Sequence, residues 1–207
     1  TLTVTDNDEG VTTATTTVRV RNTTRGRLYL DEVWSGQHHL LDDVLVPTGL
    51  NLTIEPGTEL VIDGIPGETE YYHALKIDGS LTAESVNISS VTDQPGGWQG
   101  ILVKGSADLN HIELRHAKRG IAALIGSNVV IKNSTFQKNN LGLHAYGAFP
   151  IIENTYFINN NWYAIKEDVS GRPTVIDCIF KENGINYYQK TKSAITIEEI
   201  NALSGNS

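Results

Sequence analysis

The second half of the chain repeats one pattern of apolar and polar positions. Large apolar residues recur at Leu114, Phe136, Phe157 and Phe180, with spacings of 22, 21 and 23 residues. Three residues before them is a polar column: His111, Asn133, Asn154 and Asp177. Five residues before them is an apolar column: Leu109, Ile131, Ile152 and Val175. A fourth column places a small residue before an apolar one: Gly100, Gly120, Gly142 and Ala164. Four columns in one register establish an internal repeat of about 22 residues.

Each repeat consists of short strands rather than helices. Its apolar residues alternate with a period of two, as in Ile101 and Val103 or Ile121 and Ala123. Helical repeats of roughly 33 to 47 residues are too long for this period. The sequence therefore predicts an all-β fold, a right-handed single-stranded parallel β-helix in which each coil of about 22 residues holds three short strands.

The polar column predicts a corner between two strands. Asparagine and aspartate tolerate the left-handed backbone conformation that a tight corner requires. We therefore expect Asn133, Asn154 and Asp177 to stack at one corner, where their side chains can hydrogen-bond to one another. The other outward columns carry both charge signs: Asn110, Lys132, Glu153, Ile176; Arg115, Gln137, Ile158, Lys181; and His116, Lys138, Asn159, Glu182.

Several segments resemble the pectate-lyase-like β-helix superfamily. They are Trp34-Ser-Gly36, residues 52–62 (LTIEPGTELVI), residues 75–83 (LKIDGSLTA) and residues 97–101 (GWQGI). They are similar to the repeat region of secreted and surface-displayed β-helix proteins of archaea and bacteria, over roughly residues 28–200. The resemblance implies the fold and an extracellular or cell-surface location. It implies no single activity, because this fold hosts lyases, hydrolases, adhesins and inert spacers.

The two ends of the chain depart from the repeat. Residues 1–24 contain two strands around the turn 6–10 (DNDEG), and they resemble the last hairpin of a polycystic-kidney-disease-type, immunoglobulin-like domain. The alternative is a cap on the β-helix, which we expect over residues 25–189. Asp6, Asp8 and Glu9 are candidate calcium ligands, although acidic residues are also common in solvated turns. Residues 190–207 form a C-terminal cap or a linker, and residues 197–203 have the spacing of a short helix.

Composition narrows the possible partners. The 207 residues carry a net charge of -8, which argues against a nucleic-acid partner. No apolar run is long enough to span a membrane, and the single cysteine, Cys178, excludes an internal disulfide. Cys178 shares an inward column with Ser134 and Thr155, so we expect a buried, inert thiol. The chain begins at Thr1 and contains no methionine, so we expect a piece of a longer polypeptide whose other domains are partners.

Catalysis in this fold would need acidic or basic groups that converge on one face. Glu113, Arg115 and His116 are the catalytic candidates, and the competing interpretation is a surface salt bridge with His111 at the corner. Lys166, Glu167 and Asp168 form a second polar group with the same two interpretations. No outward column supplies two carboxylates on adjacent coils. The sequence therefore favours a non-enzymatic role, with a lyase or hydrolase of acidic polysaccharide as the alternative.

Aromatic residues supply the candidate binding sites. Tyr71 and Tyr72, beside Glu68 and Glu70, lie in a loop excursion over residues 65–73 and are candidate ligand-binding residues. Trp98 and Trp162 are candidate sugar-stacking platforms, helped by Tyr146, Tyr163, Tyr187 and Tyr188, unless they cover the sheet edges instead. His38 and His39 point to opposite faces of a strand and cannot share a metal ion. We expect no cofactor besides calcium.

These observations predict an extracellular structural or adhesive β-helix module. Its expected partners are polysaccharides or cell-surface glycans. A lyase or hydrolase fragment and a non-catalytic glycan-binding module remain as alternatives.

Overall fold

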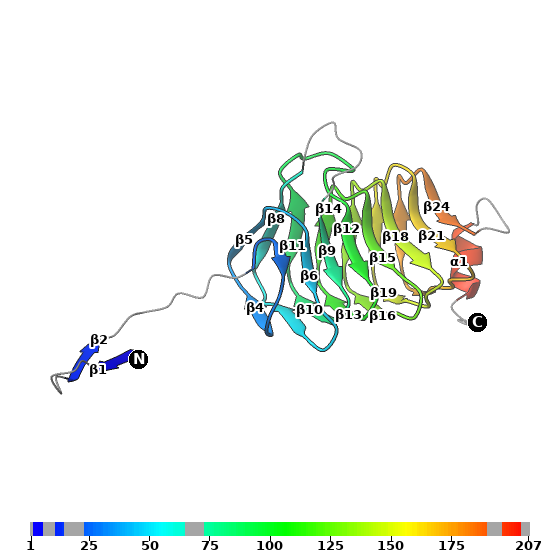
Figure 1. Ribbon diagram of the computed structural model, residues 1–207. Helices are drawn as coiled ribbons and strands as arrows, with labels where there is room; N and C mark the ends of the chain where they lie inside the picture. Colours follow the sequence, from blue (N-terminus) through cyan, green and yellow to red (C-terminus); the bar gives the residue numbers. More distant parts are fainter. Residues whose placement is uncertain (1, 6–10, 15–22, 65–72, 190–195, 204–207) are drawn as a thin grey trace.

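The chain forms a parallel β-solenoid of three sheets (Figure 1). The structure is a computed structural model, and it describes residues 2–5, 11–14, 23–64, 73–189 and 196–203. The first sheet contains β4 (Glu32–Trp34), β7 (Asn51–Ile54), β10 (Ser80–Glu84), β13 (Ser106–Asn110), β16 (Asn128–Lys132), β19 (Ile151–Glu153) and β22 (Thr174–Ile176). The second contains β5 (Gln37–Leu40), β8 (Glu59–Ile62), β11 (Asn87–Ser90), β14 (Glu113–Arg115), β17 (Thr135–Gln137), β20 (Tyr156–Ile158) and β23 (Ile179–Lys181). The third contains β3 (Gly26–Arg27), β6 (Val44–Val46), β9 (Ala74–Ile77), β12 (Gly100–Val103), β15 (Arg119–Ala123), β18 (Leu141–Tyr146), β21 (Tyr163–Asp168) and β24 (Ile185–Tyr188).

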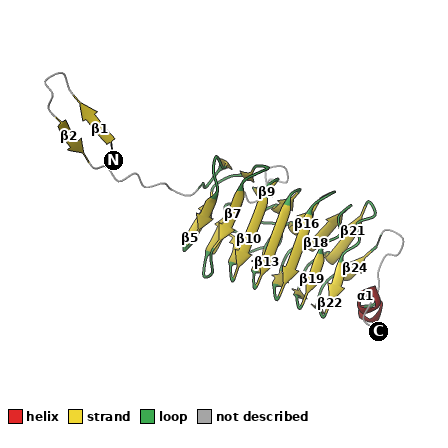
Figure 2. Cartoon of the chain, turned by 90° about the horizontal axis from the view of Figure 1, so that it is seen from below, coloured by secondary structure: helices red, strands yellow, loops and turns green. Residues whose placement is uncertain are grey.

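Each strand pairs in parallel with the equivalent strand of the next coil, so the sheets run along the solenoid (Figure 2). The register pairs Leu114 with Phe136, Phe136 with Phe157, and Phe157 with Phe180. These are the pairs that the repeat of about 22 residues predicts. The predicted all-β parallel architecture is confirmed.

The core is a column of stacked side chains, and its aromatic members explain the glycine column. Phe136 and Phe157 stack with ring centroids 5.4 Å apart, and Phe157 and Phe180 with centroids 5.5 Å apart. A Cβ atom at Gly142 would lie 2.7 Å from the Phe157 ring and 2.6 Å from the carbonyl oxygen of Ala164. Only glycine leaves that space free, so the rings and the small residues are two parts of one packing arrangement.

The corners adopt the predicted left-handed conformation. The φ angles of His111, Asn133, Asn154 and Asp177 are 51°, 49°, 47° and 49°. The expectation that these side chains hydrogen-bond to one another is wrong for Asn133, whose Nδ2 donates to Asn110 Oδ1 at 2.8 Å instead. These residues therefore suit the corner because they tolerate a positive φ angle, and not because their side chains form a ladder of hydrogen bonds.

A ladder of asparagine amides does form one strand later, in the interior. Asn139 Nδ2 donates to Asn160 Oδ1 at 3.1 Å, and Asn160 Nδ2 donates to Asn183 Oδ1 at 2.8 Å. The side chains also accept from backbone amides, as when Ala117 N donates to Asn139 Oδ1 at 2.8 Å. Asn139 and Asn160 are fully buried. These bonds satisfy backbone groups at a turn where the sheet hydrogen bonds end.

Each end of the solenoid is covered differently. At the first coil, the side chain of Glu32 accepts hydrogen bonds from Thr23 N at 2.9 Å and from Trp34 Nε1 at 2.8 Å, and His38 stacks on Trp34 at 4.0 Å. At the last coil, helix α1 (Ile197–Leu203) packs against β22 and buries Ile200. Thr196 and Glu199 cap this helix reciprocally.

The N-terminal strands β1 (Leu2–Thr5) and β2 (Val11–Ala14) form an antiparallel sheet of their own. The resemblance to an immunoglobulin-like hairpin and the capping alternative both stay predictions. The calcium candidates Asp6, Asp8 and Glu9 lie outside the described residues. In the part of the chain that the structure describes, no helix is long and apolar enough to cross a membrane.

Candidate functional site

The outer face of the third sheet carries a cluster of charged and aromatic side chains near its C-terminal end. We name it the tyrosine cluster; its members are His144 and Tyr146 on β18, Tyr163, Lys166 and Asp168 on β21, and Tyr188 on β24. The register pairs His144 with Lys166, Lys166 with Tyr188, and Tyr146 with Asp168. Three consecutive coils therefore contribute to one surface.

The six side chains form a continuous line of contacts. The rings of Tyr163 and Tyr188 lie 5.2 Å apart, and Lys166 Nζ lies 5.7 Å from the centre of the Tyr188 ring. Asp168 Oδ2 is 2.7 Å from Lys166 Nζ and 3.0 Å from His144 Nε2. The His144 ring meets Tyr146 edge to face at 5.8 Å. Asp168 is thus the centre of the line, with aromatic rings at both ends.

Burial and neighbouring charges set the protonation states in this cluster. Burial, together with the positive charges of Arg119 and Lys166, lowers the pKa of His144 below its ordinary value, although Asp168 opposes the shift. Nδ1 of His144 is buried and has no hydrogen-bond partner among the described residues. Burial acts to raise the pKa of Asp168, but hydrogen bonds from Lys166 and His144 outweigh it and lower the pKa. A neutral imidazole donating from Nε2 to an ionised Asp168 fits both shifts.

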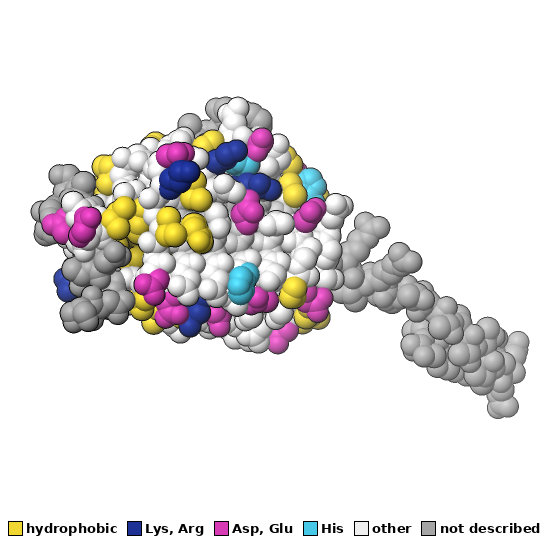
Figure 3. All heavy atoms as spheres, turned by 180° about the vertical axis from the view of Figure 1, so that it is seen from behind, with side chains coloured by type: hydrophobic (Ala, Val, Ile, Leu, Met, Phe, Trp, Pro, Cys, Tyr) yellow, Lys and Arg dark blue, Asp and Glu magenta, His cyan; other side chains and the backbone are white. Residues whose placement is uncertain are grey.

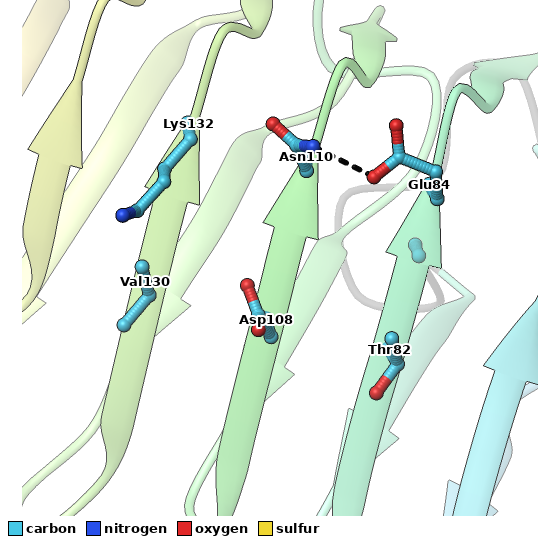
Figure 4. A pocket seen from close by; sticks show the side chains of 7 residues that line it. Thr82, Glu84, Asp108, Asn110, Val130 and Lys132 are labelled. Carbon is cyan, nitrogen blue, oxygen red and sulfur yellow. Dashed lines mark hydrogen bonds between the residues drawn. The ribbon is translucent and has the colours of Figure 1, made fainter.

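A second candidate is a polar hollow of about 340 Å³ on the outer face of the first sheet (Figure 4). Its lining residues are Thr82, Ala83, Glu84, Asp108, Asn110, Val130 and Lys132. Asn110 Nδ2 donates to Glu84 Oε2 at 2.7 Å, and this bond is the main reason why the pKa of Glu84 is lowered. Asp108 is exposed and pairs in register with Thr82, so Glu84 and Asp108 are diagonal neighbours on adjacent strands.

Comparison with known proteins adds one finding about the fold. A family model described as the right-handed β-helix region matches residues 75–202, which is more than half of the chain. The chain belongs to this β-helix family. No curated protein and no solved structure matches it.

The catalytic candidates of this β-helix point in different directions. Glu113 and Arg115 share the outer face of β14, with Glu113 Oε1 3.1 Å from Arg115 Nη1. His116 is buried at the following corner, where its Nε2 lies 3.1 Å from Asp93 Oδ1. His111 lies at the preceding corner, 3.1 Å from Glu84. The structure brings Glu113 and Arg115 together on the outer face, whereas His116 is buried at the corner and contacts Asp93 instead of either of them.

The second polar group also divides between two faces. Lys166 and Asp168 belong to the tyrosine cluster, whereas Glu167 points into the core and accepts a hydrogen bond from Tyr187 Oη at 2.8 Å. Burial, followed by the bond and charge of Glu167, raises the pKa of Tyr187. Alternation along β21 explains the division, because successive side chains of a strand point to opposite faces.

The aromatic candidates of the β-helix fall into buried and accessible sets. Trp98 and Tyr187 are fully buried and face the core, so they cannot serve as sugar-stacking platforms. Trp98 Nε1 donates to the carbonyl oxygen of Arg115 at 3.0 Å. Trp162 remains 51% exposed, and Tyr146 is exposed within the tyrosine cluster. The ligand candidates Glu68, Glu70, Tyr71 and Tyr72 lie outside the described residues and stay predictions.

Two further expectations concern single residues. His38 is buried against Trp34, while His39 faces outward with its Nε2 2.6 Å from Asp63 Oδ1, so the two histidines do face opposite ways.

Cys178 is buried, and burial raises the pKa of its thiol to about 11. The thiol is therefore protonated near neutral pH, as an inert cysteine should be.

Proposed function

We propose that this β-helix is a structural and adhesive module of a secreted or cell-surface protein, and that it contacts carbohydrate through the tyrosine cluster. The observation that carries the proposal is the unbroken line of contacts from Tyr163 through Asp168 to Tyr146. Membership of the β-helix family supports the structural part. The extracellular location rests on the resemblance of the repeat segments.

The chemistry of the cluster suits a sugar better than an apolar ligand. Aromatic rings offer flat apolar faces for the C–H groups of a pyranose, while carboxylate and ammonium groups bond its hydroxyls. Lys166 and Asp168 are held by each other and by their neighbours before any ligand arrives. A preorganised site loses less conformational entropy on binding.

Electrophoresis of the full chain through gels containing individual polysaccharides tests the proposal. We expect at least one polysaccharide to retard the chain, and we expect Tyr188→Ala and Asp168→Asn each to weaken the apparent affinity at least tenfold. Tyr29→Ala is the matched control, because Tyr29 is 86% exposed on the first coil, beside Arg27. The proposal is wrong if no polysaccharide retards the chain, or if Tyr188→Ala is retarded as strongly as the unchanged chain.

Hydrolysis or elimination of a polysaccharide is the second candidate function, and the polar hollow is the observation that favours it. Two carboxylates, Glu84 and Asp108, line that hollow from adjacent strands. A hydrolase needs one carboxyl that keeps its proton, so that it can protonate the leaving group. The bond from Asn110 lowers the pKa of Glu84 and so acts against this role.

The same polysaccharides, incubated with the chain, distinguish binding from catalysis. New reducing ends, or unsaturated ends that absorb in the ultraviolet, would establish the second function if Asp108→Asn abolished them. Retention without such products supports an adhesive module. The loop tyrosines can be tested in the same gels through Tyr71→Ala and Tyr72→Ala.

A further inference from the structure

We propose that Asp42, Asp43 and His73 form a binding site for a divalent transition-metal ion that joins the first two coils. One ligand atom from each residue lies within 4.8 Å of the other two. Among the described residues, this is the one group of three such side chains that meets so closely. The sequence alone predicts no metal at these positions, because 30 residues separate Asp43 from His73.

The fold brings the three residues together at equivalent places in neighbouring coils. Asp42 and Asp43 form the corner between β5 and β6, and His73 directly precedes β9, which pairs with β6. His73 Nδ1 lies 3.2 Å from Asp42 Oδ1. The His73 side chain is 15% exposed and that of Asp42 is 59% exposed, so the site is held on one side and open to solvent on the other.

Backbone amides orient both carboxylates. Ala74 N donates to Asp43 Oδ1 at 2.8 Å, and Asp43 N donates to Asp42 Oδ1 at 2.6 Å. A carboxylate has about four lone-pair positions, so each of these two still has capacity for a metal ion. Such outer contacts fix the direction of metal ligands and are a regular part of metal sites.

The ligand set indicates the class of metal. One imidazole nitrogen with two carboxylate oxygens suits zinc, cobalt or manganese, whereas magnesium and calcium prefer ligand sets made only of oxygen. Lys76 also contacts Asp43 Oδ2 through its ammonium group. Two carboxylates against one ammonium leave a local charge of about -1, so Lys76 weakens cation binding without cancelling it.

His39 provides a natural comparison within the same coils. Its Nε2 lies 2.6 Å from Asp63 Oδ1, so it forms a histidine–aspartate pair that is closer than the 3.2 Å pair at His73. No second carboxylate among the described residues completes a group of three around it. Metal binding at the site of three ligands should therefore not change when His39 is replaced.

Calorimetric titration of the full chain with Co²⁺, Zn²⁺ and Mg²⁺ tests the proposal. We expect Co²⁺ and Zn²⁺ to bind and Mg²⁺ to bind at least tenfold more weakly. His73→Ala and Asp42→Asn should each weaken Co²⁺ binding at least tenfold, while His39→Ala leaves it unchanged. Lys76→Met should strengthen binding at least threefold, because it removes the competing ammonium.

Circular dichroism shows whether each variant keeps its fold. If His73→Ala unfolds, the loss of Co²⁺ binding in Asp42→Asn decides the test, because this side chain is exposed. Bound Co²⁺ should also raise the melting temperature of the unchanged chain, since the ion joins two coils of the folded state. The proposal is overturned if Co²⁺ and Zn²⁺ do not bind, if Asp42→Asn binds Co²⁺ as well as the unchanged chain, or if His39→Ala reduces binding equally.

Discussion

Asparagine has two different roles in this solenoid, and the backbone decides which one applies. At the corner, Asn133 and Asn154 adopt positive φ angles that most residues avoid. In the interior, Asn139 and Asn160 use their amides to satisfy backbone groups that no strand can reach. The first role tolerates other residues, because His111 and Asp177 also occupy the corner. The second requires one donor and one acceptor on the same short side chain.

Replacing Asn160 with alanine tests the interior role. The change removes bonds to Asn139, Asn183 and the carbonyl oxygen of Phe136, and it leaves buried polar groups without partners. We expect the free energy of unfolding to fall by about 3 kcal/mol. Asn161→Ala is the control, because the side chain of this exposed neighbour makes one long hydrogen bond within the described residues, 3.4 Å to Asn140 Oδ1. Equal losses for the two variants in denaturant titrations would contradict the ladder.

The buried thiol of Cys178 makes stability depend on pH in the alkaline range. Burial raises its pKa from 9.0 to about 11, so the unfolded chain loses this proton first as the pH rises. The free energy of unfolding should therefore fall by roughly 1.4 kcal/mol per pH unit between pH 9 and about 11. We expect Cys178→Ala to lack this part of the decline, as measured by denaturant titration at each pH. A pH-independent difference between the two proteins would show that the thiol is not buried.

At the scale of elements, a strict period makes the strands predictable. Side chains of a strand alternate between core and solvent, so a period of two within a repeat of about 22 residues determines both the element and its partner. The columns of Phe136 and Gly142 were therefore visible in the sequence, although the contact between ring and glycine emerges only from the structure. The short helix over residues 197–203 was visible for the same reason, through its spacing of apolar residues.

Helix α1 provides a test of how the last coil is covered. Ile200 is fully buried in the end of the solenoid, whereas Ile197 on the same helix is 40% exposed. Ile200→Ala should lower the free energy of unfolding by about 3 kcal/mol. Ile197→Ala should change it by about 0.5 kcal/mol or less. Equal losses of stability for the two variants in thermal or denaturant unfolding would contradict the packing of α1 on the last coil.

For the whole molecule, the candidate sites were less predictable than the fold. Tyr146, Asp168 and Tyr188 each belong to a different coil, and their proximity depends on the exact register of β18, β21 and β24. The chemistry of residues such as Trp98 and Tyr187 is compatible with a place on the surface. The alternation of side chains along the strands and the adjoining turns instead direct these two into the core. The asparagine ladder did leave a signal, since Asn139, Asn160 and Asn183 follow spacings of 21 and 23 residues.

The distribution of charge is also a property of the whole molecule. The net charge of -8 does not gather at one site: Figure 3 shows acidic and basic side chains mixed over one face. Pairs such as Lys132 with Glu153, 3.0 Å apart on neighbouring coils, repeat this mixture at short range. Partly exposed pairs of this kind contribute little to stability, so their main effect is a well-solvated surface.

Chemical-shift mapping by nuclear magnetic resonance tests whether the tyrosine cluster contacts carbohydrate. An oligosaccharide from a polysaccharide that retards the chain would be titrated into the labelled protein, with tyrosine ring and asparagine amide signals recorded at each step. We predict that the largest shifts fall on Tyr146, Tyr163 and Tyr188. Shifts confined to the Asn110 amide in the polar hollow, or the absence of shifts at all three tyrosines, would contradict a carbohydrate contact at the tyrosine cluster.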